Sequence, residues 1–178
     1  MKKFLIVLAI VVAIIALSIF SVFSVQNKAI SYEGQISIAE SEIAVQEKRR
    51  NDLIPKLVEC VKEYDEFEYN TLNAIIEMRG VNDESVSQIK TMVNAVAEEY
   101  PELKSATNYR ELMNELSATE NIIAHTRTNY NTWVNKYAIF ARQFPNAQLL
   151  GLMGYEVKSY PNLEFEITYD PSTSLFGE

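Results

Sequence analysis

The stretch that decides the fold is "EKRRNDLIPKLVECVKEY", Glu47 to Tyr64, in which a basic run meets a proline inside a helical pattern. Proline in a helix interior removes a backbone hydrogen bond and clashes with the preceding turn, but in the first turn its missing N–H does no harm. With Asn51 or Asp52 as the N-terminal cap, Pro55 would lie in such a first turn. The pattern therefore predicts a new helix start or a sharp kink at residues 50–55. It leaves open whether the chain reverses there.

Upstream of this stretch lies a long apolar run, Phe4 to Val25, that contains no charged residue. A helix rises about 1.5 Å per residue, so the run covers roughly 33 Å, enough for the hydrocarbon core of a bilayer. A cleaved signal peptide is the alternative, but its apolar region is typically only about 7–15 residues long. We therefore predict a single-pass transmembrane helix over residues 4–25, in contact with membrane lipid.

The basic residues that flank this run predict its orientation. Lys2 and Lys3 precede it directly, whereas Lys28 is the only basic residue among the first twenty that follow. Positively charged flanks favour the cytoplasmic side of a membrane. We expect residues 1–3 to be cytoplasmic and the large domain to be extracytoplasmic.

The charge balance argues against nucleic acid as a partner. The chain has 16 basic residues, and without Lys2 and Lys3 the remaining 14 stand against 24 acidic ones, a net charge of −10. Such a surface repels phosphate backbones. Cys60 is the single cysteine, so no intramolecular disulfide can form.

Beyond the apolar run the hydrophobic periodicity is helical, and four segments can be distinguished. The longest stripe has an unbroken three-four spacing: Tyr109, Leu112, Leu116, Thr119, Ile123, Thr126, Tyr130, Trp133, Tyr137, Phe140 and Phe144. A shorter stripe from Val86 to Tyr100 can be capped by Asn82 or Asp83 and follows Gly80, a candidate C-terminal cap of the preceding helix. That helix has two apolar faces, one of which reads Leu53, Leu57, Cys60, Tyr64, Phe67, Thr71, Ala74 and Met78, and the fourth segment is 29–50.

These segments predict an all-α protein: a transmembrane helix at 4–25, an antiparallel four-helix bundle over 26–144 and an irregular C-terminal tail over 145–178. The tail contains three of the five glycines and three of the five prolines. Leu163 to Tyr169 alternates with period two, but a lone strand without a partner is rarely stable. Within the bundle, Tyr130 and Tyr137 would need partners for their hydroxyls if they are buried.

Several motifs resemble the LemA family. The Arg49-Arg50 pair followed by "NDLIP" and "LV" is similar to the family signature, and "YPELK" (100–104), "ELSATENIIAHTRTNYN" (115–131) and "FPNAQLLGLMGY" (144–155) follow in the family's order. The sequence departs from the family at Glu47, where a leucine is usual, and in lacking a tryptophan in its first helical segment. The resemblance implies a bacterial, membrane-anchored, antiparallel helical bundle with no established catalytic activity.

No catalytic, cofactor-binding or metal-binding residues are predicted. His125 is the only histidine, and Asn121 and Asn129 occupy the positions one turn away, so a helical pair of zinc ligands is absent. Cys60 lies on an apolar face without a neighbouring base, as an unreactive packing thiol does. The carboxylate clusters lack the spacing of a calcium loop.

The sequence therefore favours a non-catalytic interaction or scaffold module of the bacterial cell envelope, with an envelope or membrane protein as its partner. A metal-binding enzyme, or a direct regulator of a membrane enzyme, is the alternative, and a membrane-shaping protein is a third possibility. The candidate motif is Arg49, Arg50, Asp52 and Pro55. Its arginines either pair with carboxylates of a neighbouring helix or form a docking site for a partner.

Overall fold

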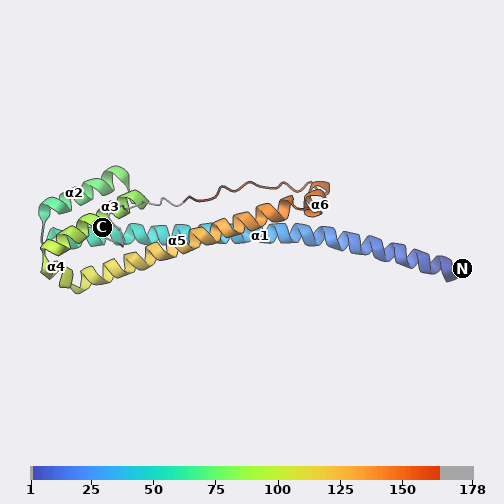
Figure 1. Ribbon diagram of the computed structural model, residues 1–178, viewed down its shortest axis with the longest axis horizontal. Coiled ribbons are helices and arrows are strands. Elements are labelled where there is room, and N and C mark those ends of the chain that lie inside the picture. The colour runs from blue at the N-terminus through green and yellow to red at the C-terminus, as the bar shows by residue number, and fades with distance from the viewer. Residues whose placement is uncertain (1, 165–178) are drawn as a thin grey trace, which may run out of the picture. The chain divides into compact units, whose positions relative to one another are not determined.

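The structure, a computed structural model, describes residues 2–164, and every regular element among them is a helix (Figure 1). In chain order the helices are α1 (Lys2–Lys62), α2 (Glu66–Arg79), α3 (Asp83–Glu99), α4 (Pro101–Ser105), α5 (Thr107–Arg142) and α6 (Asn146–Leu152). The all-α prediction is confirmed. Most of the period-two stretch from Leu163 to Tyr169 lies outside the described residues.

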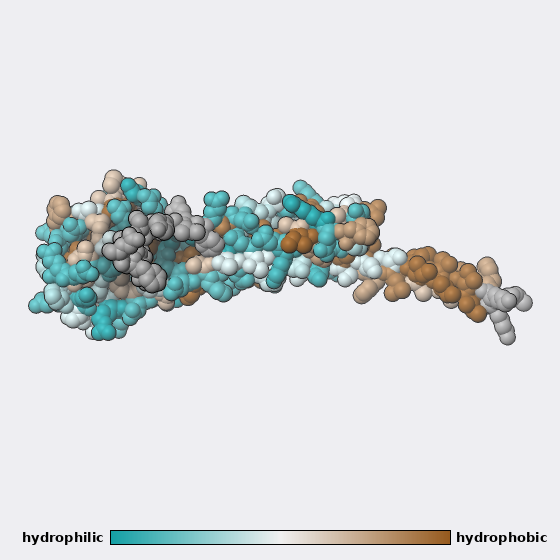
Figure 2. All heavy atoms as spheres, in the orientation of Figure 1, coloured by the Kyte–Doolittle hydropathy of each residue, from teal (hydrophilic) through white to brown (hydrophobic). Residues whose placement is uncertain are grey.

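The first part of α1 is the candidate membrane anchor. Its large apolar side chains from Phe4 to Phe20 are about half exposed or more, and Figure 2 shows hydrophobic surface along the N-terminal end of the chain. Within the described residues, α1 is the one helix that is long and apolar enough to cross a membrane. This agrees with the transmembrane helix predicted for residues 4–25.

The predicted helix start at residues 50–55 is wrong. Helix α1 runs without a break through Asn51, Asp52 and Pro55 to Lys62, so Pro55 lies in the helix interior rather than in a first turn. The local cost of the proline, about 3 kcal/mol, is outweighed because both residues before it and several after it are buried. The chain turns at Tyr64 and Asp65 instead, where Asp65 accepts a hydrogen bond from the Glu68 backbone N–H at 2.9 Å and caps α2.

This later turn also changes which face of α2 is buried. The stripe predicted to continue from Tyr64 through Phe67 to Met78 does not face a core, because Phe67 and Met78 are each 76% exposed. Helix α2 instead buries Leu72 and Ile75, from the second apolar face seen in the sequence.

The predicted caps around Gly80 are confirmed. Gly80 has φ 66°, a conformation that favours glycine, and its N–H donates to the Ile76 carbonyl at 2.8 Å. Asn82 caps α3: its side chain accepts from the Ser85 N–H at 2.9 Å, and the Ser85 hydroxyl accepts from the Asn82 N–H at 2.8 Å. Of the two candidates, Asn82 rather than Asp83 is the cap.

The described residues divide into two compact units, to which α1 and α5 both contribute. We call residues 2–44 and 124–162 the anchor unit, and residues 45–123 with 163–164 the core unit. The core unit buries one apolar cluster: Leu53, Ile54, Leu57, Val58 and Val61 of α1, Leu72 and Ile75 of α2, Val86, Ile89, Val93, Val96 and Ala97 of α3, Leu103 of α4, and Tyr109 and Leu116 of α5.

In the anchor unit, α1 and α5 run antiparallel. The Lys28 amine lies 5.5 Å from the centre of the Phe140 ring, Tyr32 packs edge-on against the same ring at 5.4 Å, and Glu33 bonds to Tyr137. Higher residue numbers on α1 thus meet lower ones on α5.

The region predicted to be an irregular tail begins with helix α6, which corrects that prediction. Asn146 is buried at its start and donates from Nδ2 to the Phe140 carbonyl at 2.9 Å, which joins α6 to the end of α5. Leu150 is the other buried residue of this helix, with 0% exposure.

The packing predicts how stability depends on Leu116, which is completely buried in the core cluster. Leu116→Ala removes apolar contacts and leaves a cavity, so we expect the free energy of unfolding to fall by about 2–5 kcal/mol. Phe67→Ala, at an exposed position, is the control and should change it by no more than about 0.5 kcal/mol. Denaturant unfolding in detergent micelles measures both; equal effects would place Leu116 on the surface.

Candidate functional site

The two arginines of the candidate motif lie in different surroundings. Arg50 on α1 has a side chain that is only 4% exposed, whereas the side chain of Arg49 is 52% exposed. Both carry a full positive charge, but a buried charge is far more costly without partners than an exposed one. The structure therefore separates the pair into a buried and a surface residue.

Arg50 connects three helices of the core unit. Its NH1 atom lies 2.6 Å from Oδ1 of Asp83, the first residue of α3, and 3.6 Å from Oε1 of Glu120 on α5. The second distance allows electrostatic attraction but is too long for a good hydrogen bond. Arg50 Nε and Glu120 Oε1 are buried without a hydrogen bond in the described part of the chain. The Asp83 bond is therefore the main compensation for the buried guanidinium.

Arg49 forms a surface ion pair with Glu115 of α5. Its Nε donates to Glu115 Oε1 at 3.1 Å and its NH2 donates to the same oxygen at 2.7 Å. Exposed pairs of this kind contribute at most about 1 kcal/mol because water screens them. Both arginines thus have carboxylate partners within the core unit, as the structural interpretation of the motif expected.

Asp52 and Pro55 do not form a helix cap. Both side chains are exposed on the surface of α1, on the side away from the buried Leu53 and Ile54. The four residues of the candidate motif therefore do not converge on one site: Arg50 points into the core, and the other three face solvent.

A second polar cluster, in the anchor unit, was not found from the sequence. Glu33 of α1 accepts hydrogen bonds at Oε1 from the hydroxyls of Tyr137 (2.9 Å) and Tyr155 (2.8 Å). Its Oε2 pairs with Lys158 Nζ at 2.9 Å. The Lys158 backbone N–H also donates to the Tyr137 hydroxyl at 3.1 Å, and Tyr160 packs edge-on against the Tyr137 ring at 5.7 Å.

The Glu33 cluster fastens the segment after α6 onto α1 and α5. Burial of Glu33 favours its neutral form, but the hydrogen bonds from Lys158, Tyr155 and Tyr137 favour the carboxylate and lower its pKa below the ordinary value of 4.5. Burial and the hydrogen bond to Glu33 raise the pKa of Tyr155 in turn, so its hydroxyl stays protonated and donates. The predicted need of Tyr137 for a partner is confirmed.

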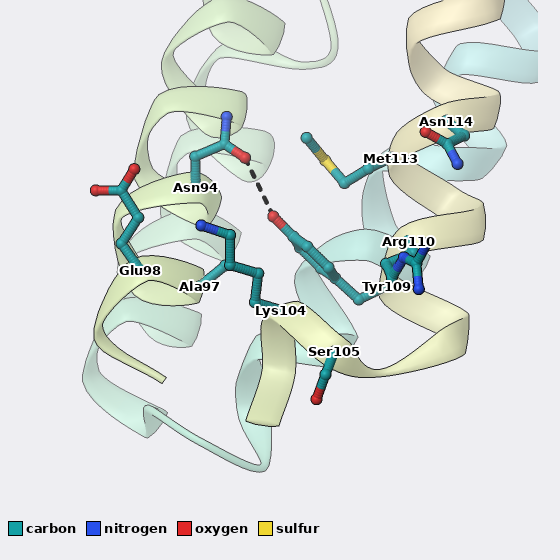
Figure 3. A pocket seen from close by; sticks show the side chains of 9 residues that line it. All are labelled: Asn94, Ala97, Glu98, Lys104, Ser105, Tyr109, Arg110, Met113 and Asn114. Atoms are coloured by element: carbon teal, nitrogen blue, oxygen red, sulfur yellow. Dashed lines mark hydrogen bonds between the residues drawn. The ribbon is translucent and has the colours of Figure 1, made fainter. Parts of the chain in front are cut away.

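An open depression lies in the core unit between α3, α4 and α5 (Figure 3). It has a volume of about 580 Å³, and the Tyr109 hydroxyl donates within it to Asn94 Oδ1 at 3.1 Å. Lys104 and Arg110 contribute cations to its lining, and in Figure 3 Glu98 points outward. Neither a histidine nor a cysteine lines it.

The remaining reactive residues are isolated. Cys60 borders two neighbouring clefts, but burial and the nearby Glu63 and Glu59 raise the pKa of its thiol, so it stays protonated and weakly nucleophilic. His125 is exposed on α5. Among residues 2–164 there is no group of three histidine, cysteine or acidic side chains that could hold a metal ion.

The first prediction from this geometry compares the adjacent arginines. Arg50→Ala removes the buried guanidinium and its hydrogen bond to Asp83, whose side chain is 40% exposed, so it should lower the free energy of unfolding by about 1.5–3 kcal/mol. Arg49→Ala is the matched control and should lower the free energy of unfolding by no more than about 1 kcal/mol. Denaturant unfolding in detergent micelles distinguishes them. A cost at Arg50 as small as that at Arg49 would contradict the buried ion pair.

The second prediction concerns pH. The folded-state pKa of Glu33 is lowered, so its stabilisation is complete above pH 4.5 and is lost as the pH falls through the folded value. Glu33→Gln should lower the free energy of unfolding by about 1.5–3 kcal/mol at neutral pH, which is the range for hydrogen bonds to a charged group. The difference in the free energy of unfolding between this variant and the unmodified chain should shrink as the pH falls. A difference that does not depend on pH would contradict a stabilising Glu33 carboxylate. Glu156→Gln, at an exposed position, serves as the control.

The comparisons with known proteins agree with this architecture. The model of the LemA family matches residues 39–173. Protein LemA of Metamycoplasma hominis is 29% identical over 119 residues, which covers 60% of this chain and 54% of that relative. The chain thus spans about half the length of the curated relative it matches. The family match includes the Arg49–Pro55 motif, helices α2 to α6 and the Tyr155–Tyr160 segment, and it covers well over half of the chain. The chain belongs to the LemA family.

Proposed function

We propose that this protein is a single-pass, membrane-anchored helical module of the bacterial cell envelope that acts by binding another envelope or membrane protein. In this proposal it has no catalytic activity of its own, and its domain is a scaffold or interaction surface. The observation that carries the proposal is α1, one helix that contains both an exposed apolar segment of membrane length and residues packed into the folded units.

The N-terminal segment supports anchoring because no element among residues 2–164 covers it. None of the side chains in its most apolar stretch is buried. An uncovered apolar run of this length is stable only in a lipid environment or against another apolar surface. The packed residues of α1 begin soon afterwards, with Ala29 at 0% exposure. Membrane segment and folded domain are therefore joined without a flexible linker.

The finer architecture that we propose is an antiparallel helical bundle formed from residues 26–144. The antiparallel contacts of α1 and α5 in the anchor unit and the shared apolar cluster of α1, α2, α3 and α5 in the core unit support it. Short connections at 63–65, 80–82 and 106 suit neighbouring helices of opposite direction.

An interaction role is supported by what the polar clusters do. Arg50 and Glu33 both bond to residues of their own unit, so their charges are used within the fold. In contrast, Phe67 and Met78 expose large apolar side chains on α2, eleven residues and about three turns apart and therefore on one face. Phenylalanine and methionine are enriched in protein interfaces relative to the rest of the protein surface.

We propose that the folded domain is extracytoplasmic, since Lys2 and Lys3 precede the anchor and only Lys28 follows it closely. A reporter that is active only outside the cytoplasm, fused after Glu178, should be active. Activity of a cytoplasm-restricted reporter at that position would reverse the orientation and leave the anchor itself in place.

Photo-crosslinking in native membranes tests the interaction role. A photoreactive residue at Phe67 or Met78 should trap the same partner protein, because both positions lie on one face of α2. Glu42, which is exposed on α1 in the anchor unit, is the control position and should not trap it. Extraction with alkaline carbonate tests the anchor in the same samples. Absence of any protein crosslink at both positions, with the chain retained in the membrane, would contradict the proposed surface.

A further inference from the structure

The end of the anchor unit that lies next to the apolar segment has an unusual surface. Phe144, in the α5–α6 connection, is 82% exposed, and Leu152, the last residue of α6, is 84% exposed. Figure 2 shows hydrophobic surface at the place where Figure 1 labels α6. Large apolar residues that are exposed together mark a contact surface rather than a solvated face.

The contacts of α5 place this surface at the level of the anchor's end. Phe140 touches Lys28 and Tyr32 of α1, and the Asn146 side chain joins the start of α6 to the Phe140 carbonyl. Lys28 is three residues beyond the apolar run, about 4.5 Å along the helix. The α5–α6 connection therefore lies about one helical turn from the point at which α1 would leave the hydrocarbon.

The charges at this end differ from those of the rest of the chain. From Tyr137 to Gly154 the sequence contains one charged residue, Arg142, and from Phe4 to Tyr32 it contains only Lys28. In the described part of the chain, neither of these two cations forms an ion pair. In a chain of net charge −8, the α5–α6 connection and α6 thus carry no acidic residue, and the nearest acids in the sequence, Glu33 and Glu156, lie just outside these ranges. Anionic lipid headgroups attract such a surface and would repel the acidic remainder.

The Glu33 cluster holds α6 in this position. The chain is tied to α5 at Asn146, the first residue of α6, and to Glu33 on α1 through Tyr155 and Lys158, after the helix. Leu150 faces inward with 0% exposure, so the opposite side of α6 is the one left uncovered. Both ends of the short helix are fixed, and its exposed face is preorganised.

We propose that the α5–α6 connection and α6 form a second membrane contact. Phe144 and Leu152 insert into the boundary between headgroups and acyl chains of the bilayer that holds the anchor, and Lys28 and Arg142 face the lipid phosphates. Amphipathic elements at this depth typically bury their apolar face about 5–10 Å into the boundary. The inference rests on the proposed anchoring by residues 4–25, and it adds a fixed distance and orientation of the anchor unit relative to the lipid surface.

The test uses tryptophan fluorescence of the full chain in vesicles of phosphatidylcholine and phosphatidylglycerol, with lipids brominated near the top of the acyl chains as quenchers. The native Trp133 is first replaced, Trp133→Phe, and a single tryptophan is then introduced by Phe144→Trp or Leu152→Trp. Because both native side chains are more than four-fifths exposed, these changes leave the packing intact. Circular dichroism verifies that the helices are retained.

Two control positions calibrate the quenching. Phe20→Trp, in the apolar segment, reports on anchoring, and Ile38→Trp reports on an exposed position of α1 about 20 Å beyond Val25 by helical rise. We expect Phe144→Trp and Leu152→Trp to lose fluorescence as strongly as Phe20→Trp, and Ile38→Trp to keep it.

The outcomes separate the inference from the proposed function. Quenching at Phe20 with none at Phe144 and Leu152 overturns the second membrane contact and leaves the anchor intact. Blue-shifted but unquenched emission at these two positions also overturns it, in favour of a protein neighbour such as a second copy of the chain. No quenching at Phe20 removes the anchor, and the inference fails with it.

Discussion

The structure depends on the continuity of α1 through Pro55. Arg50 lies before Pro55 and Leu57 and Val61 lie after it, so one core unit can bury all three only if the helix continues through the proline. The proline opposes this locally by about 3 kcal/mol. Burial of Leu53, Ile54 and Leu57 around it returns about 1.5–3 kcal/mol for each side chain. Tertiary packing therefore decides the path of the chain against local propensity.

The Arg50 cluster and the Glu33 cluster each hold different elements of the fold together. In the core unit, the Arg50 guanidinium fixes α3 to α1 and α5 through Asp83 and Glu120, and its burial penalises any arrangement that separates these partners. In the anchor unit, Glu33 gathers donors from α5 and from the segment after α6. The first cluster specifies the packing of helices, and the second fixes α6 beside the end of the anchor.

Much of the architecture could be predicted from the sequence because its signals are local. The apolar run, the stripe on α5 from Tyr109 to Phe140, and the caps at Gly80 and Asn82 each depend on residues only a few positions apart, and they agree with the structure. Phe144, the last residue of the predicted stripe, is the exception, because it lies beyond the end of α5 and is 82% exposed. The path at Pro55 could not be predicted, since the local signal favoured a helix start and the opposing term came from burial against α2, α3 and α5. The misplaced turn then shifted the predicted stripe, and Phe67 and Met78 were assigned to the core although they are exposed.

The Glu33 cluster was missed for a different reason. Its partners lie 104 to 125 residues away along the chain, and a single glutamate among polar neighbours carries no sign of them. The sequence indicated only that Tyr137 would need a partner. The basic character of Arg49 and Arg50 is visible in the sequence, but their different burial depends on which face of α1 packs against the core, and the predicted helix break obscured that face.

A distance between spin labels at Lys48 and Glu63 tests the continuity of α1 most directly. Both positions are exposed, both lie in the core unit, and Cys60→Ser removes the native thiol so that labels attach only at introduced cysteines. An unbroken helix separates the two backbones by about 22 Å, from fifteen residues of helical rise. A chain reversal at residues 50–55 would instead bring them to about 13 Å, from the spacing of packed helices and an offset of about six residues along them. The account predicts the long distance, and a dominant short distance would contradict it.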